Sequence, residues 1–368
     1  MLTNHPAIAA AALVALAAAT CRSAPAAADV APPSGLGIKR AEPPVADVPI
    51  ARYLEENLPR YRAAVAGARA WLDSLEVDPV ALRSAGFKGK KKLVEILDAY
   101  LDLLRAAPPD SPDQDAILER VADLAEPTWS AAYHDMATAD DTQFKQDSTS
   151  YLRAAYLLDR AGFDTSYYLA HILRILPRLN AHMALRGTDQ RMAFHTYYSH
   201  FKLPEPFPLA QAFQAGLIAA RASPAVIWRG GAYQFTHEIF VPYEFGKNLD
   251  AQFFSEDDMA YLREVLPVLM HDAIARNDPD LAGELSSCMR YLRLTSLPSY
   301  RQSLQYLLES QKPDGTWGDY DRFLPTLGRN VDQVLTLHTV LVALNALHAA
   351  FTGAIPDAGA GIGGDLGD

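Results

Sequence analysis

The stretch that decides the fold is Gln311-Lys-Pro-Asp-Gly-Thr-Trp317-Gly-Asp-Tyr320. Apolar residues with helical spacing precede it over 300–310 and follow it over 331–351. Pro-Asp-Gly is a typical turn sequence, because proline presets one backbone angle and glycine adopts conformations that other residues avoid. The pattern predicts two helices joined by a tight turn, a hairpin of the kind that closes a ring of helices.

The rest of the chain repeats this helical pattern. Nearly every segment after position 50 has apolar residues at helical spacing, and none alternates convincingly as a strand would. We expect helices over 54–75, 90–106, 113–124, 147–160, 165–185, 191–201, 207–220, 232–245, 255–276, 278–292, 300–310 and 331–351. Such hairpins bury their apolar faces either in an open solenoid or in a closed α/α toroid. No repeat of fixed period favours the solenoid, so the prediction is an all-α toroid with a central cavity over residues 51–352.

The first 50 residues predict export. Residues 7–19 are apolar but fall short of the roughly 20 residues that span a bilayer as a helix, and small residues and prolines follow them. This is typical of a secretory signal over 1–28, although the start has no Lys or Arg. Two processing routes stay open: lipidation of Cys21, as in a bacterial lipoprotein, or cleavage near 26–28. We expect a flexible leader over 29–50, a disordered tail over 353–368, and a location in the periplasm or cell envelope.

Composition and charge restrict the classes of binding partner that we expect. The chain has 368 residues, a formal net charge of -11 and two cysteines, Cys21 and Cys288. Both processing routes consume Cys21, so no internal disulfide is expected, and Cys288 fits a small buried residue. Lys88–Lys92 is the one basic run, which disfavours nucleic-acid binding. Membrane contact is expected only through a lipid on Cys21.

The pattern Gln-x-x-Asp-Gly-x-Trp-Gly at 311–318 resembles the glutamine–tryptophan repeat of squalene and terpenoid cyclases, and a related unit in protein prenyltransferase β subunits. The resemblance is strong over 298–350. Over 190–295 the chain is loosely similar to uncharacterised bacterial α/α-toroid proteins. The resemblance implies the toroid fold. In prenyltransferases a zinc-binding His occupies a position similar to that of His338. The acidic Asp-x-Asp-Asp cluster of the cyclases and the zinc-binding Cys of the prenyltransferases have no counterpart here, so neither activity is expected.

Several polar residues on predicted helices are candidates for a site in the cavity. His195, His237, Glu238 and Glu284 are the catalytic candidates, and His237 and His338 are candidate ligands for zinc or another divalent metal. A zincin helix would need a second His at 241, where the chain has Val. For each histidine taken alone, a structural role is the alternative.

Two further functions stay open from the sequence. A carbohydrate-active enzyme would use Asp314, Asp319 and Asp321, with Trp317 and Tyr320 as a sugar-stacking platform. The alternative is that these aspartates form turns and caps. A non-catalytic helical scaffold would instead bind a partner in the envelope. A small molecule or a glycan is the expected ligand. No phosphate-binding glycine loop and no Gly-x-Ser-x-Gly motif occurs, which disfavours nucleotide chemistry and serine hydrolysis.

Overall fold

The computed structural model describes residues 49–76, 87–108, 110–131, 133–320 and 329–352. This part of the chain is helical and contains no strand, so the all-α prediction is confirmed. The elements are α2 (Ile50–Asp73), α3 (Phe87–Ala106), α4 (Pro112–Ala125), η1 (Glu126–Trp129), α5 (Asp141–Arg160), α6 (Ser166–Met183), α7 (Thr188–His200), α8 (Leu209–Gln214), α9 (Pro224–Val226), η2 (Ile227–Gly231), α10 (Ala232–Phe240), η3 (Val241–Gly246), α11 (Glu256–Ala275), α12 (Pro279–Tyr291), α13 (Pro298–Ser310) and α15 (Arg329–Phe351). The predicted signal, with Cys21, most of the leader and the tail lie outside the described residues.

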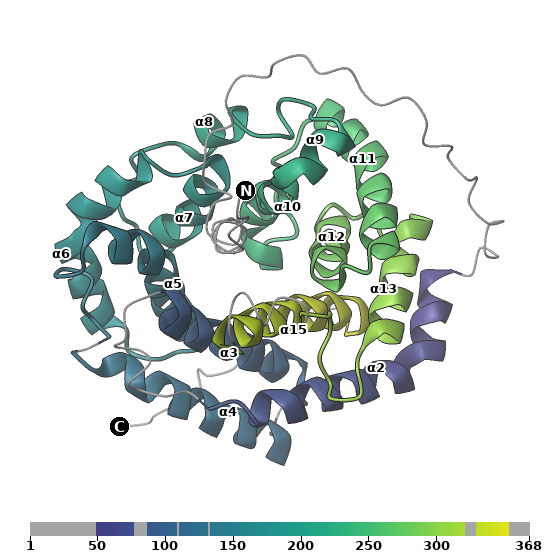
Figure 1. The fold of residues 1–368 in the computed structure, drawn as a ribbon, viewed down its shortest axis with the longest axis horizontal. Helices are drawn as coiled ribbons and strands as arrows, with labels where there is room; N and C mark the ends of the chain where they lie inside the picture. Colours follow the sequence, from purple (N-terminus) through teal and green to yellow (C-terminus); the bar gives the residue numbers. More distant parts are fainter. Residues whose placement is uncertain (1–48, 77–86, 109, 132, 321–328, 353–368) are drawn as a thin grey trace, which may run out of the picture.

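Six helices contact one another in a closed circuit. In order, α3 packs on α5, α5 on α7, α7 on α10, α10 on α12, α12 on α15, and α15 on α3 (Figure 1). The other long helices lie on the outside of this circuit: α4 packs on α3, α6 on α5, α11 and α13 on α12, and α2 on α15. Assignment to the α/α-toroid class stays a prediction, and this circuit supports it.

Neighbouring inner helices run in the same direction. Glu95 and Asp102 of α3 bond His338 and His348 of α15, so the two helices ascend together. Helix α12 ascends with them, because Thr339 bonds Asp280 and the backbone of Val342 lies against Gly283. Parallel inner helices follow when each outer helix returns the chain to the same end, which is what the hairpins predict.

The stretch 311–317 ties the end of this circuit to its beginning. The Gln311 side-chain amide donates to the Ala64 carbonyl in α2 at 2.8 Å and to the Gly315 carbonyl at 3.0 Å. A Cβ on Gly315 would lie 2.1 Å from the Gly67 carbonyl oxygen, so the turn has room only for glycine. Trp317 is fully buried and donates to the Leu307 carbonyl at 2.7 Å. The side chain of Gln311 therefore joins the turn to α2.

Two expected helices end early. The one predicted over 207–220 stops at Gln214, because Gly216 begins a turn whose next two amides bond a buried carboxylate. The one predicted over 232–245 gives way after Phe240 to a 3-10 turn with Pro242 in its first turn. Most other boundaries fall within a few residues of their predicted positions, and α5 begins six residues earlier because Asp140 caps it.

Candidate functional site in the central cavity

Side chains from all six inner helices line a cavity of about 180 Å³. It is smaller than the ~300–1,000 Å³ pockets that hold drug-sized ligands, so it suits a small molecule. Its walls are aromatic and aliphatic, with Tyr156, Tyr197, Phe240, Tyr291 and Leu341 among them. Two groups of charged side chains lie in its lining or directly behind it.

The two groups lie at different levels along helix α3. The first, here the His338 cluster, consists of Glu95, His237, Asp280, Glu284 and His338; the second, here the cationic cluster, consists of Arg105, Arg153 and Lys247. Glu95 contacts His338, and Arg105 follows Glu95 by ten residues. At 1.5 Å per residue this places Arg105 about 15 Å further along the helix. A ligand in the cavity therefore meets different chemistry at its two ends.

His338 lies among three carboxylates. Its Nδ1 is 3.1 Å from Glu95 Oε1, and its Nε2 is 3.5 Å from Glu284 Oε1 and 3.9 Å from Asp280 Oδ1. Burial opposes the charged ring, but the surrounding carboxylates outweigh it and raise the pKa of His338 to about 10. At neutral pH the ring is therefore an imidazolium that can donate from both nitrogens to these carboxylates.

The carboxylates around His338 have partners of their own. The Thr236 hydroxyl donates to Glu284 Oε2 at 2.5 Å, the Tyr233 hydroxyl donates to Asp280, and Lys91 lies 3.5 Å from Glu95. Burial raises the pKa of Glu284, but His338 and His237 together with the Thr236 bond bring it below its usual value. For Asp280, burial prevails and raises the pKa. The His338 cluster is thus a largely paired network, in which the Oε2 atom of Glu95 has no hydrogen-bond partner among the described residues.

His237 lies at the edge of this cluster and faces the cavity. Its Nδ1 bonds the Tyr233 carbonyl at 2.7 Å, which fixes the proton on that nitrogen because a carbonyl can only accept. Nε2 is then the nitrogen that can take up a proton or accept a hydrogen bond. Phe240 and Phe245 pack against the ring.

The predicted metal site has no ligand set. Within the described residues, no group of three or more His, Cys, Asp or Glu is arranged to hold a metal ion. His237 and His338 both line the cavity, but the first bonds a backbone carbonyl through Nδ1 and the second is charged. The structure therefore gives no support to zinc at these two residues.

The cationic cluster is less fully paired. Arg153 pairs with Asp98, and Arg105 lies 2.7 Å from Asp102 Oδ1. Lys247 differs: its Nζ donates to the Tyr156 hydroxyl at 3.0 Å and lies 4.3 Å from the centre of the Tyr156 ring, and among the described residues no carboxylate forms an ion pair with it. Burial, followed by the charge of Arg105, lowers the pKa of Lys247 to about 7. The carboxylate of Asp98, which lines the same cavity, opposes this shift without forming an ion pair with Lys247.

A family model described as Domain of unknown function (DUF6895) matches residues 61–348. The chain belongs to this family. The match runs from within α2 into α15 and includes every residue that lines the cavity. No curated protein and no solved structure matches the chain. None of the described helices has the length and apolar character needed to cross a bilayer.

Two of the predicted catalytic residues lie outside the cavity. Glu238 points the other way from His237, and its carboxylate accepts from the amides of Leu217 and Ile218 at 2.8 and 2.9 Å. His195 bonds Glu205 at 2.8 Å and does not line the cavity. A single sequence could not separate these residues from His237 and Glu284, because helical spacing alone does not say which face is inward. The prediction of Glu238 and His195 as members of the site is therefore corrected.

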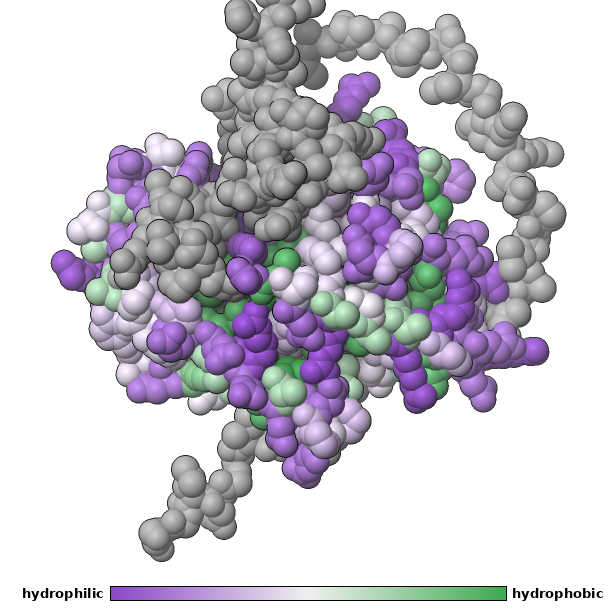
Figure 2. Space-filling model, turned by 60° about the horizontal axis from the view of Figure 1, so that its bottom comes forward, coloured by the Kyte–Doolittle hydropathy of each residue, from purple (hydrophilic) through white to green (hydrophobic). Residues whose placement is uncertain are grey.

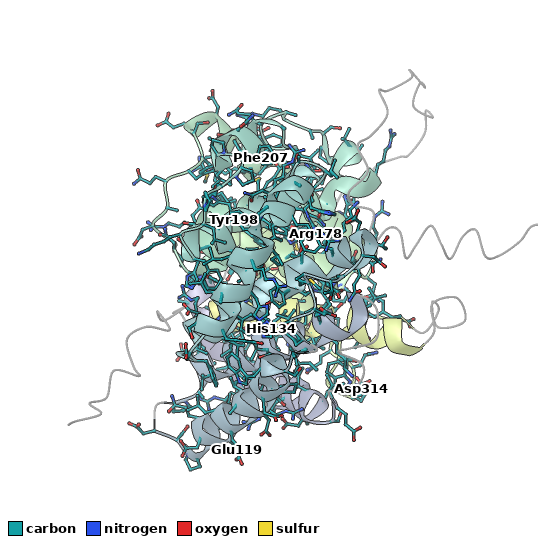
Figure 3. The ribbon with its side chains drawn as sticks, turned by 90° about the vertical axis from the view of Figure 1, so that its left-hand side faces the viewer. Glu119, His134, Arg178, Tyr198, Phe207 and Asp314 are labelled. Carbon is teal, nitrogen blue, oxygen red and sulfur yellow. The ribbon has the colours of Figure 1, made fainter. Side chains whose placement is uncertain are left out.

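The predicted sugar platform is also corrected. Trp317 has no exposed surface, so its ring cannot stack on a ligand. Asp314 accepts from the amide and the hydroxyl of Thr316 at 3.0 and 2.7 Å, which is the turn that glycine-containing sequences of this kind favour. Figure 3 shows Asp314 near the edge of the molecule. Asp321 lies outside the described residues.

The residues that sequence reasoning missed are those of the cationic cluster. Arg153 follows Tyr151-Leu152 and precedes two alanines in the apolar part of α5, and Asp98 follows Leu97 within the apolar stripe of α3. Charges at such positions are unusual unless they are paired or face a cavity. That signal was present in the sequence, whereas nothing in the sequence around Lys247 indicated that the turn after α10 directs it inward.

Proposed function

We propose that this protein binds a small organic anion in the central cavity, with the anionic group at the cationic cluster. The observation that carries the proposal is the partly buried Lys247, which forms no ion pair with any described residue and lines the cavity together with Arg105 and Arg153. A desolvated charge is unfavourable unless an opposite charge compensates it. A carboxylate or phosphate supplies that charge and accepts charge-assisted hydrogen bonds from lysine and arginine.

The remainder of the cavity fits such a ligand. Each guanidinium carries five N–H donors, and the pairs with Asp98 and Asp102 leave part of this capacity for a ligand. The aromatic rings of Tyr156, Tyr197 and Tyr291 give the body of the molecule an apolar surface. His237 and Glu284 at the other end provide groups that accept a proton or a hydrogen bond.

The alternatives from the sequence are less well supported. A scaffold that binds a partner on its outside predicts a filled interior and a large exposed apolar patch. The exposed large apolar side chains in the described part come from several separate segments: Tyr167, Leu173, Leu185, Val226, Tyr233 and Val268. The face in Figure 2 is mostly hydrophilic where it is described, with apolar residues in small groups. A glycan remains a candidate ligand only in a form that carries an acidic group and fits the cavity.

We propose that the chain is exported to the periplasm or cell envelope, with Cys21 lipidated or removed. We also propose that the fold is an α/α toroid of the terpenoid cyclase and prenyltransferase-like kind. The closed contact circuit and the Gln311 contacts with α2 support the second of these.

Isothermal titration with matched ligands tests the proposal. L-Lactate, propionate and glycerol 3-phosphate are the anionic probes, and lactamide, propionamide and glycerol are the neutral ones. We expect at least one anion to bind in preference to its neutral counterpart. We also expect Arg105→Met to weaken that binding by tenfold or more, since a lost charge-assisted bond in a buried pair costs about 2–5 kcal/mol.

The matched control is Arg263→Met, because Arg263 is exposed on α11 and away from the cavity. Its affinity should equal that of the wild type. Binding of none of the anions at millimolar concentration would refute the proposal, and so would equal losses in the two arginine variants.

A further inference from the structure

Lys247 is aimed into the cavity by an unusual backbone. Glu244 and Phe245 have φ angles of 49° and 55°, and Gly246 has a φ of 86°, so three residues in a row are left-handed. For residues with a Cβ this conformation is unfavourable, and it is rare outside single turn positions. The turn places Phe245 and Lys247 side by side in the cavity lining.

From this geometry we propose that Lys247 forms an imine with the carbonyl group of a small oxo acid, whose carboxylate is bound by Arg105 and Arg153. The inference rests on the proposed anion site and names its substrate class. An oxo acid such as pyruvate carries its carboxylate directly beside the carbonyl carbon. Holding the carboxylate at the two arginines therefore brings that carbon to the neighbouring amine.

The reaction balances without an oxidant or a reductant. The Lys247 nitrogen attacks the carbonyl carbon, the C–N bond forms, and the π electrons move to oxygen, which takes a proton. The resulting carbinolamine loses hydroxide, which leaves as water with one added proton, and the C=N bond forms. The products are one imine and one water molecule.

Tyr156 is placed to assist the proton transfers. Its oxygen accepts from Lys247 Nζ at 3.0 Å, so its own proton is free to point toward the ligand. Burial raises the pKa of Tyr156 to about 12, which keeps the phenol protonated at neutral pH. It can therefore donate to the departing oxygen, and it recovers a proton from the nitrogen.

Lys247 also has the protonation state that imine formation needs. Only a neutral amine has the lone pair that attacks carbon, and lysines that form imines are those whose pKa is lowered by burial or by neighbouring cations. Lys247 meets both conditions, because it is partly buried and lies near Arg105, Arg160 and Arg153, whose combined effect with burial exceeds the opposing effect of Asp98. Lys90, by contrast, is buried but bonds two carboxylates, Asp135 at 2.7 Å and Asp147 at 3.3 Å.

Reductive trapping tests the inference. The full chain is incubated with pyruvate or glyoxylate at pH 7.5, reduced with sodium cyanoborohydride, digested and mapped by mass spectrometry. We expect the reduced adduct on Lys247 at ten times or more its level on Lys202, an exposed lysine after α7. L-Lactate, which has the same carboxylate but no carbonyl, should lower the yield by competition.

Two variants separate the chemistry from the binding. Lys247→Arg keeps a cation and removes the amine, so it should lose the adduct and still bind L-lactate in the titration. Tyr156→Phe should slow adduct formation and leave lactate affinity within about threefold. Lactate binding without an adduct on Lys247 would refute the imine and leave the anion site standing. Absence of lactate binding together with equal adducts on Lys247 and Lys202 would refute both.

Discussion

The two ends of the cavity hold charge in opposite ways. At one end His338 lies between three carboxylates, and each of these has a further donor. At the other end Lys247 contacts the hydroxyl group and the ring of Tyr156, and no carboxylate in the described part of the chain forms an ion pair with it. A cluster whose charges are largely paired stabilises the fold. A cation without an ion pair indicates where an anionic ligand can bind. The comparison assigns a mainly structural role to the His338 cluster and a binding role to the cationic cluster.

The largest expected effect comes from breaking the paired end. His338→Ala leaves Glu95, Asp280 and Glu284 as neighbouring carboxylates without their shared cation. Removing one member of a buried charged network typically costs about 3–5 kcal/mol, and we expect a loss of unfolding free energy of that size in urea titrations. His271→Ala is the control, since His271 is 73% exposed and should change stability little. A His338→Ala protein as stable as the control would contradict the pairing.

The next effect is a difference in pH dependence between the two ends. The pKa of His338 is raised to about 10, so its contribution to stability is complete below about pH 6.5, its ordinary value, and is lost as pH rises through 10. The pKa of Lys247 is lowered to about 7, so the unfolded chain binds more protons between pH 7 and about 10.5, and stability rises with pH across that window. The two slopes oppose each other in the wild type.

Single variants reveal each slope separately. Between pH 7 and 9, His338→Gln should gain stability relative to the wild type as pH rises, and Lys247→Met should lose it. Each slope is at most about 1.4 kcal/mol per pH unit, because one proton is involved. Urea midpoints collected at half-unit pH steps measure both. If the stability of both variants relative to the wild type changed with pH in the same direction, the two ends would not hold charge in opposite ways.

A smaller effect is expected where the sequence misidentified a residue. Glu238→Ala leaves the amides of Leu217 and Ile218 without their acceptor, and a buried group left unsatisfied costs about 1–3 kcal/mol. The loss should appear in thermal unfolding, while L-lactate affinity stays within about twofold of the wild type. A variant that folds normally and loses lactate binding would show that Glu238 is part of the binding site.

The sequence was a good guide to helices and to the joint that closes the chain on itself. Helical spacing located most elements, and Gln311 and Trp317 predicted a structural hairpin because their side chains suit backbone groups and a buried corner. It was a poor guide to which face of each helix is inward. His237 and Glu238 are consecutive residues that point in opposite directions, and only packing decides between them.

The cationic cluster could not be assembled from the sequence for a related reason. Arg105, Arg153 and Lys247 lie 48 and 94 residues apart along the chain, and the circuit of helices brings them together. The left-handed turn at 244–246 directs Lys247 inward, and two of its three residues are types that rarely adopt this backbone. Local propensity therefore predicts a continued helix there, as the expected segment 232–245 assumed.

The most direct test of the central claim is the titration of the Lys247 side chain itself. Nitrogen-detected NMR of protein labelled with ¹⁵N-lysine, with Lys247→Arg to assign the signal, gives its pKa with and without L-lactate. We predict a value near 7 in the free protein and an increase of at least one unit with lactate, because a bound anion stabilises the ammonium form, while Lys202 stays unchanged. A pKa of Lys247 near 10.5 in both samples would contradict the claim that this amine is desolvated and binds an anionic ligand.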